Sequence, residues 1–175
     1  MNVALRHAAQ RWLVCLDLEG RPEFVDPMVL IGCRRAIAVA RGRGWRVVHL
    51  YRGREREGGV RALPGLSPLP SETVLLRPGL SAFSSAAFRD QALSIPQIEI
   101  AVVGADMAAA GLATGLAAED LGLKAFLLRE AFPDAKALRA VETLLDDRGG
   151  RLSIAPLGVF ARQEDGLALT PANEP

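Results

Sequence analysis

This sequence has almost no net charge and no long apolar run. The 21 basic residues nearly balance the 20 acidic ones, so the composition gives no indication of a nucleic-acid or anionic-membrane partner. No apolar run approaches the roughly 20 residues that a membrane-spanning helix needs, and the first residues lack a charged-then-apolar leader. We therefore expect a cytoplasmic protein that binds neither nucleic acid nor membranes.

Cysteine and histidine are also rare. Cys15 falls in an expected buried strand and Cys33 in an expected helix, which favours two core residues over a disulfide. His7 and His49 are far apart, and neither cysteine has a second Cys or a His nearby, so no spacing is typical of a metal site. We expect no metal and no cofactor, and we interpret His49, inside an expected strand, as a structural residue.

The residues that are abundant predict one well-filled domain. Half of the 175 residues are hydrophobic, which suits a single domain over residues 1–175. Residues 1–11 are expected to form a short helix or an arm, and residues 162–175 a C-terminal tail.

The stretch 98–130 indicates the fold class. An apolar run at 98–103 breaks at Gly104, small and apolar residues follow at helical spacing, and a second apolar run begins at Ala125. A helix between two mostly apolar strands predicts parallel, buried strands with a right-handed connection, and helices must then cover both faces of the sheet. The sequence thus predicts an α/β protein.

The same patterns place the remaining elements. Asp26 is the expected N-cap of a helix whose first residue is Pro27. Residues 159–161 are expected to pair at a sheet edge or with a second subunit, and the charged, Gly- and Pro-rich segment 52–70 is expected to be a solvated loop. Further strands are expected at 12–18, 45–51, 73–76 and 151–155, and further helices at 84–93 and 134–147.

Three expected strands end next to groups that could bind a substrate or exchange a proton with it. Asp17, Arg77 and the turn after Gly104 each follow a strand, so parallel strands would bring them to one edge of the sheet. An acid beside a fixed cation and a helix start can exchange a proton with a substrate and hold an anion. Alternatively, Asp17 and Arg77 form a structural ion pair that seals this edge. The spacing alone leaves both readings open.

Four segments, in this order, resemble the isochorismatase-like hydrolase superfamily, which includes isochorismatases, nicotinamidases and other small-amide hydrolases. The segments are residues 13–19, 66–70, 77–83 and 102–114, and the resemblance extends over most of the chain. It implies a three-layer α/β/α fold with a mostly parallel, Rossmann-like central sheet, and it usually implies a homo-oligomer.

The resemblance also assigns catalytic positions, two of which depart from the pattern. Asp17 stands at the position of the acid, but Arg77 replaces a lysine and Ala110 replaces the nucleophilic cysteine. A methyl group cannot attack a carbonyl, so the usual covalent chemistry has no nucleophile. Cys15 is a poor substitute, because it lies on the same strand face as Asp17 but one pleat below the edge. Residues 51–59 supply no histidine or aspartate for the metal site of the nicotinamidase branch.

Candidate substrate contacts lie in the matching segments and in the turn after the fourth strand. They are Glu19, Phe83, Asp106 and Met107. Glu19 stands where isochorismatases commonly have glutamine, and a second carboxylate at this edge would repel a dianionic substrate. The ligand class that this site would take is a small carboxylate or amide.

Three hypotheses for the function follow. The first, which we favour because two of three catalytic positions differ, is a family member without thiol hydrolase activity that serves in binding or assembly. The second is an active, cysteine-free hydrolase of the isochorismatase type, in which Asp17 is the general acid and Arg77 holds a substrate carboxylate. The third makes Ser84 or Ser85 a nucleophile, although no base stands beside either in the sequence.

Overall fold

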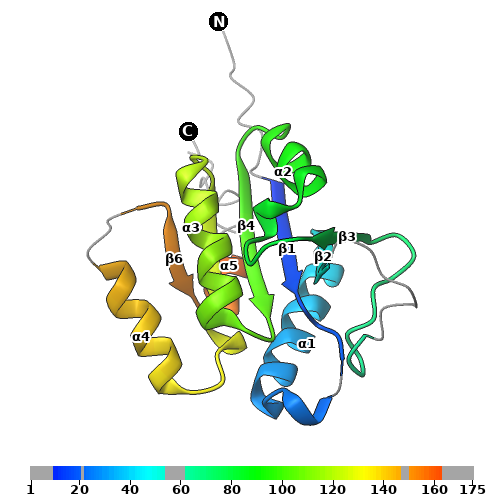
Figure 1. Cartoon of the computed structure of the whole chain (residues 1–175), viewed down its shortest axis with the longest axis vertical. Helices are drawn as coiled ribbons and strands as arrows, with labels where there is room; N and C mark the ends of the chain where they lie inside the picture. The colour runs from blue at the N-terminus through cyan, green and yellow to red at the C-terminus, as the bar shows by residue number, and fades with distance from the viewer. Residues whose placement is uncertain (1–9, 21, 54–61, 147–149, 163–175) are drawn as a thin grey trace, which may run out of the picture.

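A single six-stranded parallel sheet forms the centre of the protein. The computed structural model describes residues 10–20, 22–53, 62–146 and 150–162, and the account below concerns these residues. The strands follow the order β3-β2-β1-β4-β5-β6, and every neighbouring pair is parallel (Figure 1). The strands are β1 (Gln10–Leu16), β2 (Arg46–Arg52), β3 (Thr73–Arg77), β4 (Ile98–Gly104), β5 (Lys124–Leu128) and β6 (Leu152–Ala155).

Helices cover both faces of this sheet and complete three layers. Figure 1 shows α3 in front of the sheet, with α1 and α5 behind it. Trp12 of β1 packs its ring against Phe88 of α2, and Phe126 of β5 packs against Phe160 of α5. The helices are α1 (Pro27–Gly42), α2 (Ala86–Leu93), α3 (Leu112–Asp120), α4 (Ala135–Asp146) and α5 (Leu157–Arg162), and the short turns are η1 (Pro22–Phe24), η2 (Ala82–Ser84), η3 (Met107–Gly111) and η4 (Arg129–Ala131).

Burial on both faces explains why the central strands are mostly apolar. Six of the seven residues of β1 are buried, as are five of the seven of β2. Parallel strands need crossover connections, whose helices shield both faces from water, so no strand position can remain polar without a partner. The predicted α/β fold with a parallel central sheet is confirmed. Only residues 10 and 11 of the predicted N-terminal arm and residue 162 of the predicted C-terminal tail are described. Residues 54–61 of the predicted loop also lie outside the described residues.

The chain order of the strands reverses between β1 and β4. Leu16 pairs with Gly104 at the carboxyl ends of these two strands, and a Cβ atom added at Gly104 would lie 2.7 Å from the carbonyl oxygen of Leu16. Only glycine permits this approach. Beyond such a reversal the two connections leave on opposite faces, and open α/β sheets commonly bind their ligands at this position.

Two expectations at the ends of the chain were wrong. Arg11 belongs to β1 rather than to an arm: its Nε lies 3.2 Å from Oε2 of Glu99, and its Nη1 donates to the carbonyl oxygen of Phe160 at 2.7 Å. Residues 159–161 form part of α5, not an edge strand, because Phe160 is fully buried against Trp45 and Phe126. α5 therefore packs against the sheet beside the starts of β1 and β2.

Close contact between α1 and η4 makes Gly32 critical for stability. A Cβ atom at this position would lie 1.8 Å from the backbone carbonyl oxygen of Glu130, which cannot rotate away. We expect Gly32→Ala to lower the free energy of unfolding by about 3 kcal/mol. Gly158→Ala on α5 is the control, because nothing lies within 4 Å of its added Cβ, and we expect it to change stability by at most about 1 kcal/mol. Urea unfolding of both variants would check this, and equal stabilities would contradict it.

Candidate functional site

Asp17 leaves β1 in a backbone conformation that few residues adopt. Its φ is +53°, and its amide donates to the carbonyl oxygen of Leu50 on β2 at 3.0 Å. On the other side, the amide of Ala105 donates to the carbonyl oxygen of Leu16 at 3.2 Å. Aspartate tolerates the left-handed region better than most side chains do, and such residues gather at functional sites. Asp17 therefore stands where β1 separates from both of its neighbours.

Arg77 meets Asp17 from the last position of β3. Its side chain has no exposed surface, its Nη2 donates to Oδ2 of Asp17, and its Nη1 donates to the carbonyl oxygens of Gly79 and Leu80. Burial lowers the pKa of Arg77, and the neighbouring carboxylate of Asp17 opposes this shift. Both terminal nitrogens of the guanidinium are thus already bound to protein oxygens.

Serine side chains hold the turn after β3 in shape. Oγ of Ser84 accepts from the amide of Gly79 at 2.9 Å and donates to the carbonyl oxygen of Ser81 at 2.7 Å. Oγ of Ser81 accepts from the amide of Phe83 at 3.1 Å. Ser84 therefore serves the backbone of this turn, and Ser85 is buried at the start of α2. Neither serine is placed as a nucleophile beside a base.

The turn after β4 leads into a helix whose first part is π-helical. Oδ1 of Asp106 accepts from the amide of Ala109 at 3.0 Å and caps η3. Ala110 is fully buried within η3, and Met107 packs its thioether against Gly111. The helix that was expected to be continuous from this turn to Gly122 therefore begins with wider turns, which are frequent at functional sites.

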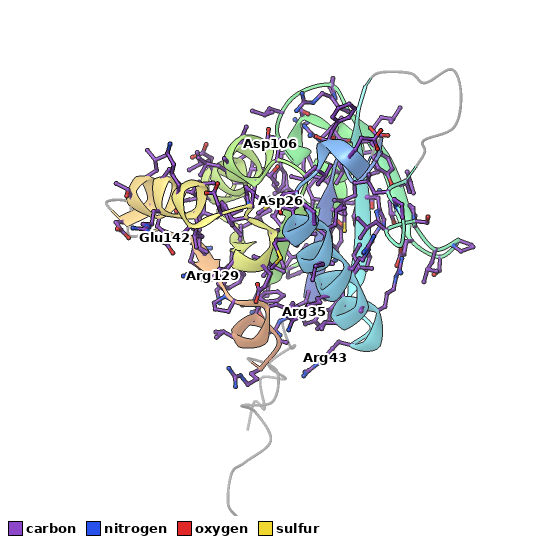
Figure 2. All side chains as sticks on the ribbon, turned by 90° about the horizontal axis from the view of Figure 1, so that it is seen from below. Asp26, Arg35, Arg43, Asp106, Arg129 and Glu142 are labelled. Carbon is purple, nitrogen blue, oxygen red and sulfur yellow. The ribbon has the colours of Figure 1, made fainter. Side chains whose placement is uncertain are left out.

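The candidate substrate contacts differ in burial, and Asp106 acts electrostatically on Arg77. Phe83 is buried and packs edge-on against Phe88 with ring centroids 5.0 Å apart, and Met107 is buried as well. Asp106 is exposed and caps η3, the turn that follows the carboxyl end of β4 (labelled in Figure 2). Glu19 forms an isolated backbone bridge with Ala62. Phe83 and Met107 are thus core residues.

Sequence reasoning missed Arg52, which belongs to β2 and not to the loop that follows. Its Nη2 lies 3.7 Å from Oδ2 of Asp17, and its side chain is 55% exposed. The position could have indicated this, because Arg52 pairs with Arg77 at the carboxyl ends of neighbouring parallel strands. Arg52 is therefore the cation that faces solvent at this edge.

Two polar atoms of the pair remain without hydrogen-bond partners. Oδ1 of Asp17 and Nε of Arg77 are buried, and no described residue bonds to either. A buried unpartnered polar group costs about 1–3 kcal/mol unless a water or another molecule bonds to it. These atoms thus favour a polar molecule at the edge.

Neither cysteine compensates for the absent thiol. Cys15 and Cys33 are free and fully buried. Burial raises the pKa of Cys15 well above its ordinary value, and burial likewise raises the pKa of Cys33 to about 12. A thiol acts as a nucleophile through its thiolate, so both are inert. In the described part of the chain, no three His, Cys, Asp or Glu side chains lie close enough together to hold a metal ion.

A second polar cluster is centred on Glu72, which directly precedes β3, and it includes His49 of β2. Nε2 of His49 is 3.0 Å from Oε2 of Glu72, and Arg41 of α1 donates to both carboxylate oxygens of Glu72 at 2.7 and 3.0 Å. Burial alone would raise the pKa of Glu72, but hydrogen bonds from Arg41, Leu69 and His49 outweigh it and lower the pKa to about 2. Burial lowers the pKa of His49, with Glu72 opposing the shift. The predicted structural role of His49 agrees with these contacts.

Similarity to known proteins is seen in structure and not in sequence. No protein-family model matches the chain, and no curated protein matches it. An isochorismatase family protein from Desulfovibrio vulgaris superimposes with a TM-score of 0.71 at 21% identity, covering 93% of this chain and 100% of that one. An isochorismatase from Pseudomonas putida gives 0.70 at 18% identity, covering 86% and 89%.

The chain has the isochorismatase-like fold. The resemblance seen in the sequence is thereby confirmed at the level of architecture. The MAR1 ribonuclease from Caenorhabditis elegans also superimposes, with a TM-score of 0.71 at 14% identity over 95% of this chain and 93% of that one. Proteins described as an isochorismatase and as a ribonuclease thus share the isochorismatase-like fold, so the fold alone does not select a reaction. None of the described helices has the length and hydropathy needed to cross a membrane.

The buried imidazole of His49 makes stability depend on pH. Its pKa in the folded protein is lowered, so as pH falls below the ordinary value of about 6.5 the unfolded chain takes up a proton that the folded protein does not. We expect the free energy of unfolding to fall between about pH 7.5 and pH 5.5, and to fall less in His49→Gln. Glu72 titrates below this window.

Urea unfolding at several pH values measures the effect. His7→Gln removes the other histidine and is the control that should keep the wild-type dependence. An unchanged slope in His49→Gln would show that another group is responsible.

Proposed function

We propose that this protein binds a small carboxylate or amide at the Asp17–Arg77 edge without hydrolysing it through a thiol. The observation that carries the proposal is the state of Arg77, which has no exposed surface and whose terminal nitrogens bind Asp17 and two carbonyl oxygens. The second function hypothesised for the sequence uses Arg77 to hold a substrate carboxylate. In that role the guanidinium would have to give up its bonds to the Asp17 carboxylate and the two carbonyl oxygens. Breaking these contacts inside the protein would cost several kcal/mol.

The nucleophile position supports the same proposal. Ala110, which the resemblance aligns with the cysteine of the thiol hydrolases, is fully buried and has no reactive atom. Covalent amide hydrolysis requires an atom that attacks the carbonyl carbon, and Cys15 is buried with a raised pKa. Thiol chemistry therefore has no route through the residues of this edge.

The chemistry of the edge supports a ligand with both donor and acceptor groups. The side chain of Asp17 is 19% exposed and its carboxylate accepts hydrogen bonds, which fits a ligand hydroxyl or amide N–H. The guanidinium of Arg52 is more than half exposed and is a permanent cation, which fits a carboxylate. A small carboxylate that carries a hydroxyl or an amide meets both requirements.

One observation favours the alternative, a cysteine-free hydrolase with Asp17 as general acid. The side chain of Asp17 keeps 19% of its surface exposed, so a substrate can reach it. An acid that protonates a substrate carbon would have to release the contact between its Oδ2 and Arg77, because Oδ1 is buried. This mechanism requires Asp17 for every turnover, so the loss of turnover in an Asp17 variant would distinguish it from binding alone.

Turnover assays distinguish the two functions. We expect the purified protein to release no pyruvate from isochorismate and no ammonia from nicotinamide or other small amides. Asp17→Asn, whose fold is checked by circular dichroism, is assayed beside it as the background. Turnover by the wild type that disappears in Asp17→Asn would overturn the binding proposal and establish an acid mechanism.

Binding assays test the role given to Arg52. Small carboxylates and their matching amides are titrated calorimetrically, and we expect Arg52→Ala to weaken the best-bound carboxylate about tenfold or more, because a hydrogen bond to a charged group contributes about 1.5–3 kcal/mol. Arg139→Ala, an exposed arginine on α4, is the control and should bind like the wild type. Equal weakening of the matching amide would contradict recognition of the carboxylate by Arg52.

A further inference from the structure

A cavity of about 330 Å³ lies between α1 and the segment that runs from η4 into α4. None of the described residues that line it belongs to the Asp17–Arg77 edge. Small-molecule sites in proteins have volumes from about 300 Å³ upward, so this space is large enough for a small ligand. It is therefore a second candidate binding site.

A glycine contact defines one side of the cavity. Gly32 of α1 lies so close to η4 that an added Cβ atom would be 1.8 Å from the backbone carbonyl oxygen of Glu130. The helix that follows η4 packs more loosely, with Val141 as the buried residue of α4. The side chains of α1 and α4 therefore leave a space beside this contact.

Large apolar side chains form much of the cavity wall. Met28 and Ile31 of α1 line it and are 61% and 45% exposed, and Phe132 and Leu138 line it from the other side. Covering such side chains removes apolar surface from water, which favours binding of an apolar group. The wall thus fits the apolar part of a ligand.

Arg35 brings a positive charge to the cavity that the protein leaves unpaired. Its side chain lies on α1, and no described residue forms a hydrogen bond or an ion pair with it. Arg129, on the opposite wall, is held by Oε1 of Glu142 at 2.9 Å (both labelled in Figure 2). A guanidinium forms two parallel hydrogen bonds with a carboxylate, so Arg35 fits an acidic group on the ligand.

Two carboxylates in the lining limit the ligand to one such group. Both oxygens of Glu130 lie 3.0 Å from the amide nitrogen of Leu157, and Oδ1 of Asp134 accepts from the amide of Ala137 at 2.7 Å. Both side chains are therefore already used by the backbone, but their negative charges remain beside the cavity. A second anionic group on the ligand would meet these charges and be repelled.

We propose that this cavity binds a monocarboxylic acid with an apolar chain or ring. Its carboxylate pairs with Arg35, and its apolar part lies against Ile31, Phe132 and Leu138. This site is independent of the proposed function, because its ligand needs no residue of the Asp17–Arg77 edge.

Methyl NMR of the full chain tests the site directly. The sequence has three methionines, Met1, Met28 and Met107, and Met28→Leu identifies the signal of Met28 at the cavity. We expect hexanoate to shift this signal saturably. Hexanamide, which lacks the charge, and hexanedioate, which adds a second one, should bind at least about tenfold more weakly. No saturable shift with hexanoate, as when a partner protein covers the cavity, would overturn the proposal, and so would equal binding of hexanamide.

Variants of three cations assign the charge. We expect Arg35→Gln to weaken hexanoate at least about tenfold and to leave hexanamide unchanged. Lys136→Gln is the matched control, because it removes a positive charge from an exposed residue of α4 that does not line the cavity. Arg52→Ala should also bind hexanoate like the wild type, which separates this site from the Asp17–Arg77 edge. Hexanoate binding that Arg35→Gln leaves intact, or that Arg52→Ala abolishes, would contradict the assignment.

Discussion

The burial of Arg77 constrains the whole carboxyl edge of the sheet. A guanidinium without exposed surface must be neutralised and hydrogen-bonded, and here Asp17 supplies the charge while Gly79 and Leu80 supply carbonyl oxygens. Meeting that requirement fixes the end of β1 against the end of β3, which lie two strands apart in the sheet. It also occupies one oxygen of the Asp17 carboxylate, the candidate acid of this edge. The same contact therefore stabilises the edge and limits its chemistry.

Much of the fold could be predicted from periodicity, because a parallel sheet imposes a strong pattern on its strands. The runs at 98–103 and 125–128 are apolar except for Glu99 because both of their faces are buried, and Gly122 ends the intervening helix segment with a φ of +74°. Residues 159–161 were misread because three apolar residues do not distinguish a strand from a helical turn. The position of Arg11 was missed because a charged side chain inside the protein depends on distant partners, Glu99 and Phe160, that no local pattern reveals.

The position of the candidate site could be predicted from the sequence, but the side chains that line it could be predicted only in part. Parallel topology was enough to bring Asp17 near Arg77, because the carboxyl ends of the strands share one edge. Which side chains face that edge depends on the direction of each residue, and motif membership does not reveal that Phe83 and Met107 are buried. Arg52 was overlooked because a run of charged residues follows it, so its place at the end of β2 was not recognised. Sequence spacing thus locates an edge, whereas side-chain direction decides what lines it.

The central position of β1 has a consequence for how the protein is made. This strand is the first to be synthesised, yet one of its two partners in the sheet is β4, whose pairing joins Gln10 to Ile98. While the ribosome adds the residues between them, β1 can pair with β2 on one side, but its other edge stays open. An open, apolar strand edge is a template for wrong pairing, so we expect the nascent chain to be most prone to wrong pairing before its fourth strand emerges. The reversal of strand order between β1 and β4 is thus also the last part of the sheet centre to form.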